Sequence, residues 1–124
     1  MHENKNLDTH MTIHEIRHLV EKLIDDRDWG QFHDAKNLSM DIAIEAGELM
    51  EHFVWTESNN VSEQFEKNRN EIEQEIADVL IVAISLCNQY NIDISTIVTK
   101  KLELIAQKYP IEKAKGKSTK YTKL

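Results

Sequence analysis

The scarcity of residues that force sharp turns is the feature that most limits how this chain can fold. Its 124 residues include three glycines and one proline, Pro110, which follows the last segment of clear helical periodicity. Few positions therefore require the chain to turn sharply, so long helices are favoured. A hydrophobic content of 40% in a chain of this length suits one compact domain with a modest core. We expect a single domain over residues 1–124.

Apolar residues at helical spacing predict four helices, each preceded by a capping residue. Thr12 and Glu15 form a capping box for the first helix, Asp34 caps the second, Asn60 and Glu63 could cap the third, and Asp93 could cap the fourth. The run VLIVAISL resembles a buried strand, but IEQEIAD leads into it at helical spacing and no other segment would pair with it. The predicted helices run from Ile13 to about Asp26, from about Ala35 to Trp55, from about Asn60 to Gln89, and from Asp93 to Lys108. We expect an all-α subunit resembling a four-helix bundle, with about ten irregular N-terminal residues and a basic, irregular tail from about residue 111.

Charge and cysteine content exclude several classes of protein. A formal net charge of -7 argues against binding to nucleic acid through its phosphates, because that mode needs a basic face. The single cysteine, Cys87, cannot form an intramolecular disulfide, which fits a reducing cytoplasmic setting. The start MHENKNLDTH has no apolar signal segment, and the longest apolar run is too short to span a bilayer. We therefore expect no nucleic-acid or membrane partner.

Two pairs of carboxylates interrupt the apolar faces of the second and third predicted helices. Glu45 falls inside the apolar stripe of the second helix, and Glu48 lies one turn further on. On the third helix, Glu75 and Asp78 lead directly into the apolar run. If the two helices pack together, these four charges repel strongly unless some are protonated or a cation joins them.

A hard divalent cation is the partner that such a group of carboxylates would take. Oxygen ligands without cysteine or histidine at matching spacing suit Mg²⁺, with Mn²⁺ as a substitute. The alternative is that the four residues are solvated on the helix flanks. Spacing alone leaves both interpretations open.

The contexts of these pairs, EAGELMEHF and EIADVLI, carry the pattern Glu45-x-x-Glu48 followed at a distance by Glu75-x-x-Asp78. This pattern resembles the metal signature of the all-α nucleoside triphosphate pyrophosphohydrolases, the MazG-like family. Within that family, RDWGQFHDAKNL, KKLELIAQKYP and the terminal KYTKL are similar to the dCTP pyrophosphatase branch. The likeness covers almost all of residues 16–124.

The resemblance implies Mg²⁺-dependent hydrolysis of a nucleoside triphosphate between the α and β phosphates, which releases a monophosphate and pyrophosphate. For the dCTP branch it implies dCTP as the favoured substrate, and it implies a house-cleaning role in the nucleotide pool. The four carboxylates would hold the metal, and Glu48, with Glu45 beside it, is the candidate to activate the attacking water.

The same resemblance implies residues for the nucleotide itself. Lys101 would neutralise phosphate oxygens, although an ordinary solvated lysine is an equal interpretation. Trp29 and Trp55 would form the walls of a base pocket, and His33 would bond the edge of the base. Core packing remains the alternative for the tryptophans, and a contact at a helix end remains the alternative for His33.

Three positions depart from the dCTP branch, and each exchanges a polar group for an apolar one. Val82 stands where those relatives carry a tyrosine, Ile105 replaces an asparagine, and Val20 replaces a histidine. A pocket with fewer hydrogen-bond partners discriminates less between bases. We therefore expect relaxed base selectivity.

The first predicted helix contains a competing motif. His14, Glu15 and His18 match H-E-x-x-H, the zinc site of many metalloproteases. A downstream third ligand and a strand to line the substrate cleft are both missing from the sequence. With His10, these histidines more simply form a polar helix face.

Two further alternatives are a non-enzymatic helical interaction module and a di-iron bundle. The di-iron site needs Glu-x-x-His pairs, which the second and third predicted helices lack. The segment from Val79 onward is apolar around the whole helix circumference, which a small four-helix unit can hardly bury alone. We therefore expect self-association, as a dimer or tetramer, under every interpretation.

Overall fold

The computed structural model describes residues 6–124, and within this range the chain is helical without any strand. The all-α prediction is therefore confirmed for these residues. No helix among them is long and apolar enough to cross a membrane. In chain order the elements are α1 (Ile13–Asp26), η1 (Trp29–Phe32), α2 (Ala35–Glu51), η2 (Ser58–Asn60), α3 (Val61–Lys67), α4 (Arg69–Gln89), α5 (Ile94–Lys108), α6 (Ile111–Ala114) and η3 (Tyr121–Lys123).

The capped helix starts agree with the sequence prediction. Thr12 and Glu15 form the expected capping box, in which the Glu15 amide donates to Thr12 Oγ1 and the Thr12 amide donates to Glu15 Oε1, each at 3.1 Å. The side chain of Asp34 accepts from the backbone of Asn37 at the start of α2. Residues 6–12 precede α1 without forming a helix, and the first five residues of the predicted irregular segment lie outside the described range.

Two predicted helix bounds were wrong. The second helix ends at Glu51 rather than Trp55. After Glu51 the backbone forms tighter turns, in which the Phe53 amide donates to the Met50 carbonyl three residues earlier. The predicted third helix is two helices, since Asn68 leaves helical geometry and its side chain donates to the Gln64 carbonyl at 3.3 Å.

Two other details also differ from the sequence prediction. The side chain of Asn60 forms no cap at the start of α3. The tail after residue 111, predicted to be irregular, contains the short elements α6 and η3.

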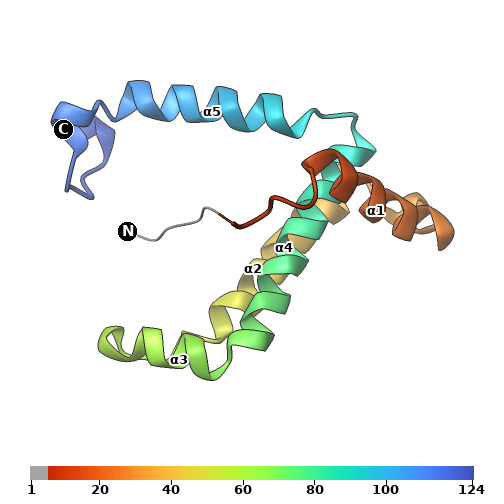
Figure 1. Cartoon of the computed structure of the whole chain (residues 1–124), viewed down its shortest axis with the longest axis horizontal. Helices are drawn as coiled ribbons and strands as arrows, with labels where there is room; N and C mark the ends of the chain where they lie inside the picture. Colours follow the sequence, from red (N-terminus) through yellow and green to blue (C-terminus); the bar gives the residue numbers. More distant parts are fainter. Residues whose placement is uncertain (1–5) are drawn as a thin grey trace. The chain divides into compact units, whose positions relative to one another are not determined.

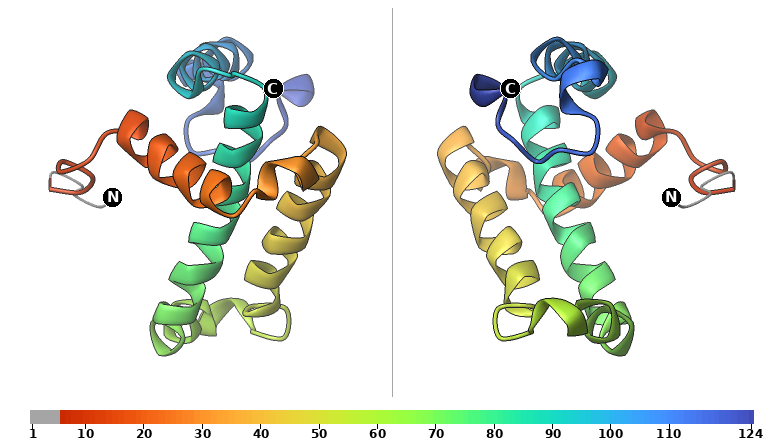
Figure 2. Two further views of the ribbon diagram at one scale, coloured as in Figure 1. Left: turned by 90° about the vertical axis from the view of Figure 1, so that its right-hand side faces the viewer. Right: turned by 90° about the vertical axis from the view of Figure 1, so that its left-hand side faces the viewer.

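The chain forms two compact units, one reaching Asn91 and the other running from Ile92 to Leu124. In the first unit, α2 and α4 lie side by side and antiparallel (Figure 1, Figure 2). The Ala35 amide at the start of α2 donates to the Tyr90 hydroxyl at the end of α4 at 2.8 Å. α1 packs on α4, and α3 connects the other ends of the pair. The α2–α4 pair is therefore the framework of this unit.

The second unit contains α5, α6 and η3. Asp93 caps α5 as predicted, accepting from the Thr96 amide at 3.0 Å. Tyr109 and Tyr121 meet edge to face at 5.8 Å, and the Lys108 ammonium lies 4.9 Å from the Tyr121 ring. These contacts hold the tail against the end of α5.

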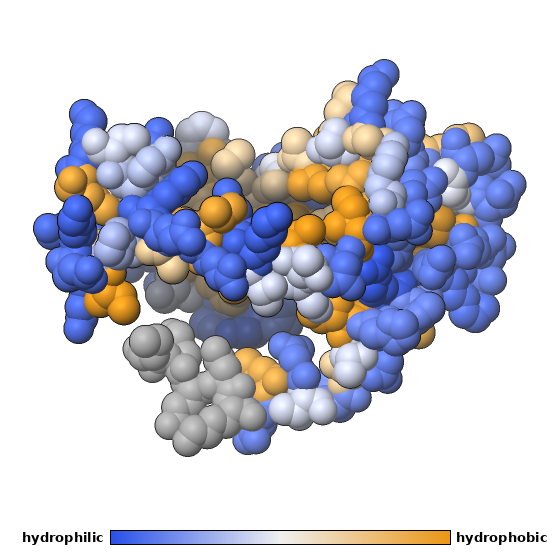
Figure 3. Space-filling model, turned by 90° about the horizontal axis from the view of Figure 1, so that it is seen from above, coloured by the Kyte–Doolittle hydropathy of each residue, from blue (hydrophilic) through white to orange (hydrophobic). Residues whose placement is uncertain are grey.

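Few side chains of one copy are buried. Within residues 6–124 the buried apolar residues are Val20, Leu38 and Ile72. Hydrophobic side chains lie exposed among hydrophilic ones on the face drawn in Figure 3. On α2 and α4 the exposed large hydrophobic residues are Met40, Ile44, Met50, Ile76, Leu80 and Ile81. Such a surface is unusual for a free monomer and fits the expectation of self-association.

Candidate metal centre

Four carboxylates meet where α2 faces α4, and we call them the acidic quartet. Each offers one oxygen, and these four oxygens lie within 4.8 Å of one another. Two members are half-buried and two are exposed. The members are Glu45 and Glu48 on α2 and Glu75 and Asp78 on α4. The structure thus brings together all four residues that the sequence selected as metal ligands.

The quartet is electrostatically strained without a cation. Burial, followed by the hydrogen bond and charge of Glu48, raises the pKa of Glu45 from 4.5 to about 7. Burial and the Glu48 carboxylate also raise the pKa of Glu75, whereas the nearby His52 acts in the opposite direction. Closely spaced carboxylates in a poorly hydrated site favour protonation or a bound cation.

The free oxygens of the quartet fit a cation. Oε2 of Glu45 and Oε2 of Glu75 are buried and have no hydrogen-bond partner among the described residues. A buried carboxylate oxygen without a partner costs stability, so such groups are usually bonded to protein, water or metal. The donor set consists of oxygen alone, which suits a hard divalent cation.

His52 borders the quartet and was missed in the sequence analysis. Its Nε2 lies 4.0 Å from Oε1 of Glu75. The His52 carbonyl accepts from Gln64 Nε2 of α3 at 2.9 Å, which fixes the end of α2. His52 lies one helical turn after Glu48, but spacing within α2 alone does not show that it meets Glu75 of α4.

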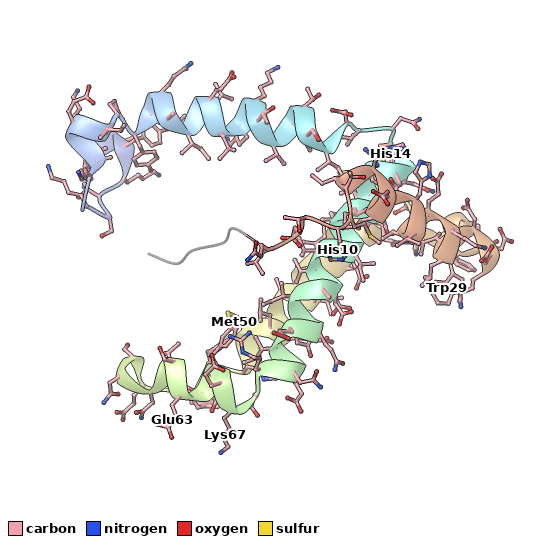
Figure 4. The ribbon with its side chains drawn as sticks, viewed as in Figure 1. His10, His14, Trp29, Met50, Glu63 and Lys67 are labelled. Carbon is pink, nitrogen blue, oxygen red and sulfur yellow. The ribbon has the colours of Figure 1, made fainter. Side chains whose placement is uncertain are left out.

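A polar hollow of about 420 Å³ lies beside the turn that follows α2. Trp55 lines it and is 92% exposed, so its indole face is open to a ligand. Glu63 and Lys67 of α3 also line it, and both are labelled in Figure 4. The remaining lining residues are Thr56, Glu57, Asn60 and Gln64.

Trp29 and His33 lie at the other end of α2. Trp29 is in η1, 45% exposed, with the Arg27 guanidinium 5.8 Å from its ring. The Gly30 carbonyl accepts from Gln89 at the end of α4, which places η1 beside that end. His33 is half-buried and lines a hollow of about 330 Å³ that runs along α2 as far as Ile44.

The described residues thus place Trp29 and Trp55 at opposite ends of α2. Its 17 residues span about 25 Å, so one copy of the first unit does not bring the two indoles together. Lys101 lies in α5 and belongs to the second unit.

The competing H-E-x-x-H motif lies on α1 without a free catalytic carboxylate. Oε1 of Glu15 accepts from the Thr12 amide at 3.1 Å and from the Thr12 hydroxyl at 3.0 Å. A carboxylate used as a helix cap is not placed to activate water at a zinc ion. The structure therefore gives no support to a protease site.

A helical framework with an all-oxygen carboxylate cluster is the arrangement of an all-α protein able to hold a hard cation, and comparisons with known proteins show its family. Residues 40–124 match the MazG-like family. Over 115 residues the chain is 34% identical to dCTP pyrophosphatase 1 of Mus musculus and 33% identical to that of Homo sapiens. Each alignment covers 91% of this chain and 68% of the relative.

The fold comparison agrees as well. A pyrophosphatase from Archaeoglobus fulgidus superposes with a TM-score of 0.77 at 36% identity, covering 89% of this chain and 98% of that one. The chain belongs to the MazG-like family. The predicted enzyme class, a nucleoside triphosphate pyrophosphohydrolase, is confirmed.

Proposed function

We propose that the enzyme is Mg²⁺-dependent, with Mn²⁺ as a substitute, and hydrolyses deoxynucleoside and nucleoside triphosphates to monophosphate and pyrophosphate. The observation that carries this proposal is the acidic quartet with its two buried, unpartnered oxygens. A triphosphate carries about four negative charges, which four carboxylates would repel without divalent cations between them. The metal requirement thus follows from the negative charges of both the triphosphate and the acidic quartet.

The quartet supplies two functions in this proposal. A bound divalent ion polarises phosphate oxygens and lowers the pKa of an attacking water. Glu48, with Glu45 beside it, takes the proton of that water as it attacks the α phosphorus and the bond to the bridging oxygen of the β phosphate breaks. Glu48 is the better candidate because its side chain is exposed, whereas burial raises the pKa of Glu45 to about 7 and favours its neutral form.

The nucleotide is held by residues outside the quartet. In this proposal the base stacks on Trp29 and Trp55, and His33 bonds the edge of the base. Lys101 neutralises the phosphate oxygens. Since one copy separates the two tryptophans along α2, a pocket that uses both needs two copies of the chain. The exposed apolar surface of α2 and α4 supports such self-association, as a dimer or tetramer.

dCTP is the favoured substrate in this proposal, by analogy with the relatives named dCTP pyrophosphatase 1. Val82, Ile105 and Val20 offer the base no hydrogen bond, so selectivity is relaxed. At least one other dNTP should be accepted within roughly tenfold of dCTP, a difference of about 1.4 kcal/mol in transition-state binding. We place the enzyme in the cytoplasm, where it removes unwanted nucleotides from the pool.

A panel of common NTPs and dNTPs with Mg²⁺, with Mn²⁺ or with chelator, resolved by chromatography, tests this function. Monophosphate and pyrophosphate should form with either metal and vanish with chelator. Diphosphate with orthophosphate, or turnover in chelator, would overturn the proposed chemistry. Strict specificity for dCTP would overturn only the relaxed selectivity.

A further inference from the structure

Two histidines on α1, neither of them a member of the acidic quartet, face each other. Nε2 of His18 lies 3.2 Å from Nε2 of His14, and the two rings meet edge to face at 4.4 Å between centroids. Both side chains are exposed, and Figure 4 shows His14 at the start of α1. We call these residues the histidine pair. The proposed hydrolysis does not use it.

The spacing of the two nitrogens matches that of two ligands on one metal ion. Imidazole nitrogens bind Zn²⁺ at about 2.0 to 2.1 Å, so two of them at angles of 90° to 110° lie about 2.9 to 3.4 Å apart. The observed 3.2 Å falls within this range without any movement of α1. Two histidines that bind one zinc ion from the same helix are usually one helical turn apart, as His14 and His18 are.

A neighbouring carboxylate lies near the second ring nitrogen of His18. Oε2 of Glu21 lies 3.6 Å from Nδ1 of His18, on the opposite side of the ring from His14. A proton kept on Nδ1 leaves the lone pair of Nε2 free, and histidine ligands commonly have such a carboxylate at their second nitrogen. The surroundings of His18 thus resemble those of a metal ligand.

We propose that the histidine pair is a second metal site, for a borderline divalent transition ion such as Zn²⁺, Ni²⁺ or Co²⁺, with water in the remaining positions. Nitrogen ligands select these ions over Mg²⁺, whereas the oxygen-only quartet suits Mg²⁺ or Mn²⁺. The bound ion links two successive turns of α1 and stabilises the folded helix. This site is independent of the proposed hydrolysis.

Calorimetric titration with Zn²⁺, in saturating Mg²⁺ to occupy the quartet, tests the proposal. The wild-type chain should bind Zn²⁺, and His14→Ala or His18→Ala should each weaken that binding at least about tenfold. The matched control, His33→Ala, changes a histidine outside the pair and should retain wild-type affinity. Circular dichroism confirms that each variant is folded.

A second measurement distinguishes Zn²⁺ bound at the histidine pair from Zn²⁺ that displaces Mg²⁺ from the quartet. Zn²⁺ should shift the histidine ring signals of His14 and His18 in NMR spectra and should raise Tm in wild type but not in the double variant. Equal Zn²⁺ affinity in wild type and the double variant would overturn the proposal. So would a wild-type chain that binds no Zn²⁺ in the presence of Mg²⁺.

Discussion

Arg17 and Asn88 hold each other through two hydrogen bonds that join α1 to the end of α4. Nε of Arg17 donates to Oδ1 of Asn88 at 2.9 Å, and Nδ2 of Asn88 donates back to the Arg17 carbonyl at 3.1 Å. Both bonds are partly buried and join residues 71 positions apart in the chain. They fix α1 against the framework that carries Glu75 and Asp78.

Replacing Asn88 by alanine should therefore loosen α1. The change removes both bonds and takes one acceptor from the charged guanidinium of Arg17. The free energy of unfolding should therefore fall by about 1 to 3 kcal/mol. Denaturant unfolding measures the loss. Asn70→Ala, an exposed change on the same helix, is the control and should stay within about 0.5 kcal/mol of wild type. Equal stability of the two variants would show that this pair does not hold α1.

The acidic quartet should behave as one unit in catalysis. Glu45→Gln, Glu48→Gln, Glu75→Gln and Asp78→Asn should each lower kcat/KM at least about 100-fold, because every change weakens the metal site that the others share. Each variant should remain folded. Glu71→Gln, an exposed change in the first turn of α4, is the matched control and should keep wild-type turnover. Near-normal turnover in two quartet variants would contradict the assignment.

The metal-free enzyme should lose stability as the pH rises towards neutrality. A carboxyl whose pKa is higher in the folded state stabilises that state when protonated, so the benefit is complete below about pH 4.5 and is lost as the pH rises through the folded pKa. For Glu45 this window runs from 4.5 to about 7, and the raised pKa of Glu75 acts in the same direction.

Thermal melts in chelator between pH 5 and about 8 test this prediction. As the pH rises, the Tm of Glu45→Gln should increasingly exceed the Tm of wild type, because the amide of the variant stays uncharged while Glu45 ionises. Excess Mg²⁺ should remove that advantage by stabilising wild type alone. A constant difference across the range would rule out the titration of Glu45 as its source.

The capped helices and the quartet were predictable because their signals are local. The helix starts carry side-chain caps that bond within three residues, at Thr12 with Glu15, at Asp34 and at Asp93. The four carboxylates of the quartet follow helical spacing along their own helices. The break at Asn68 was not predictable, because helical periodicity continues through it and a side-chain bond interrupts the helix. The contact between His52 and Glu75 depends on how α2 packs on α4, which spacing within one helix does not show.

His52 should act as a positioning residue for Glu75. Its contact with Oε1 leaves Oε2, which is buried, free for a cation. Removing a partner that orients a metal ligand typically costs 10- to 100-fold in metal affinity, so His52→Ala should weaken Mn²⁺ binding by about that factor. Titration without substrate measures it. His52→Gln retains a donor and should recover part of the affinity, whereas equal weakening in both variants would point to lost packing instead.

Each tryptophan should contribute stacking to every accepted nucleotide. Trp29→Ala and Trp55→Ala should each raise KM with little change in kcat, by roughly 5- to 150-fold, since a stacked base gains about 1 to 3 kcal/mol. Trp55→Phe keeps an aromatic face and is the matched control, with a smaller rise. Unchanged KM in both alanine variants would remove the stacking pocket from the proposal.

If one base pocket takes Trp29 from one copy and Trp55 from another, mixing the two alanine variants should restore activity. In a mixed pair, one pocket lacks both indoles and the other keeps both, because each variant supplies the residue that its partner lost. Two purified variants carrying different tags, unfolded together, refolded and selected for both tags, provide such pairs. Their kinetics should include a component with wild-type KM, which neither variant shows alone. Pairs that show only the raised KM of the separate variants would mean that each copy stacks its base on its own residues.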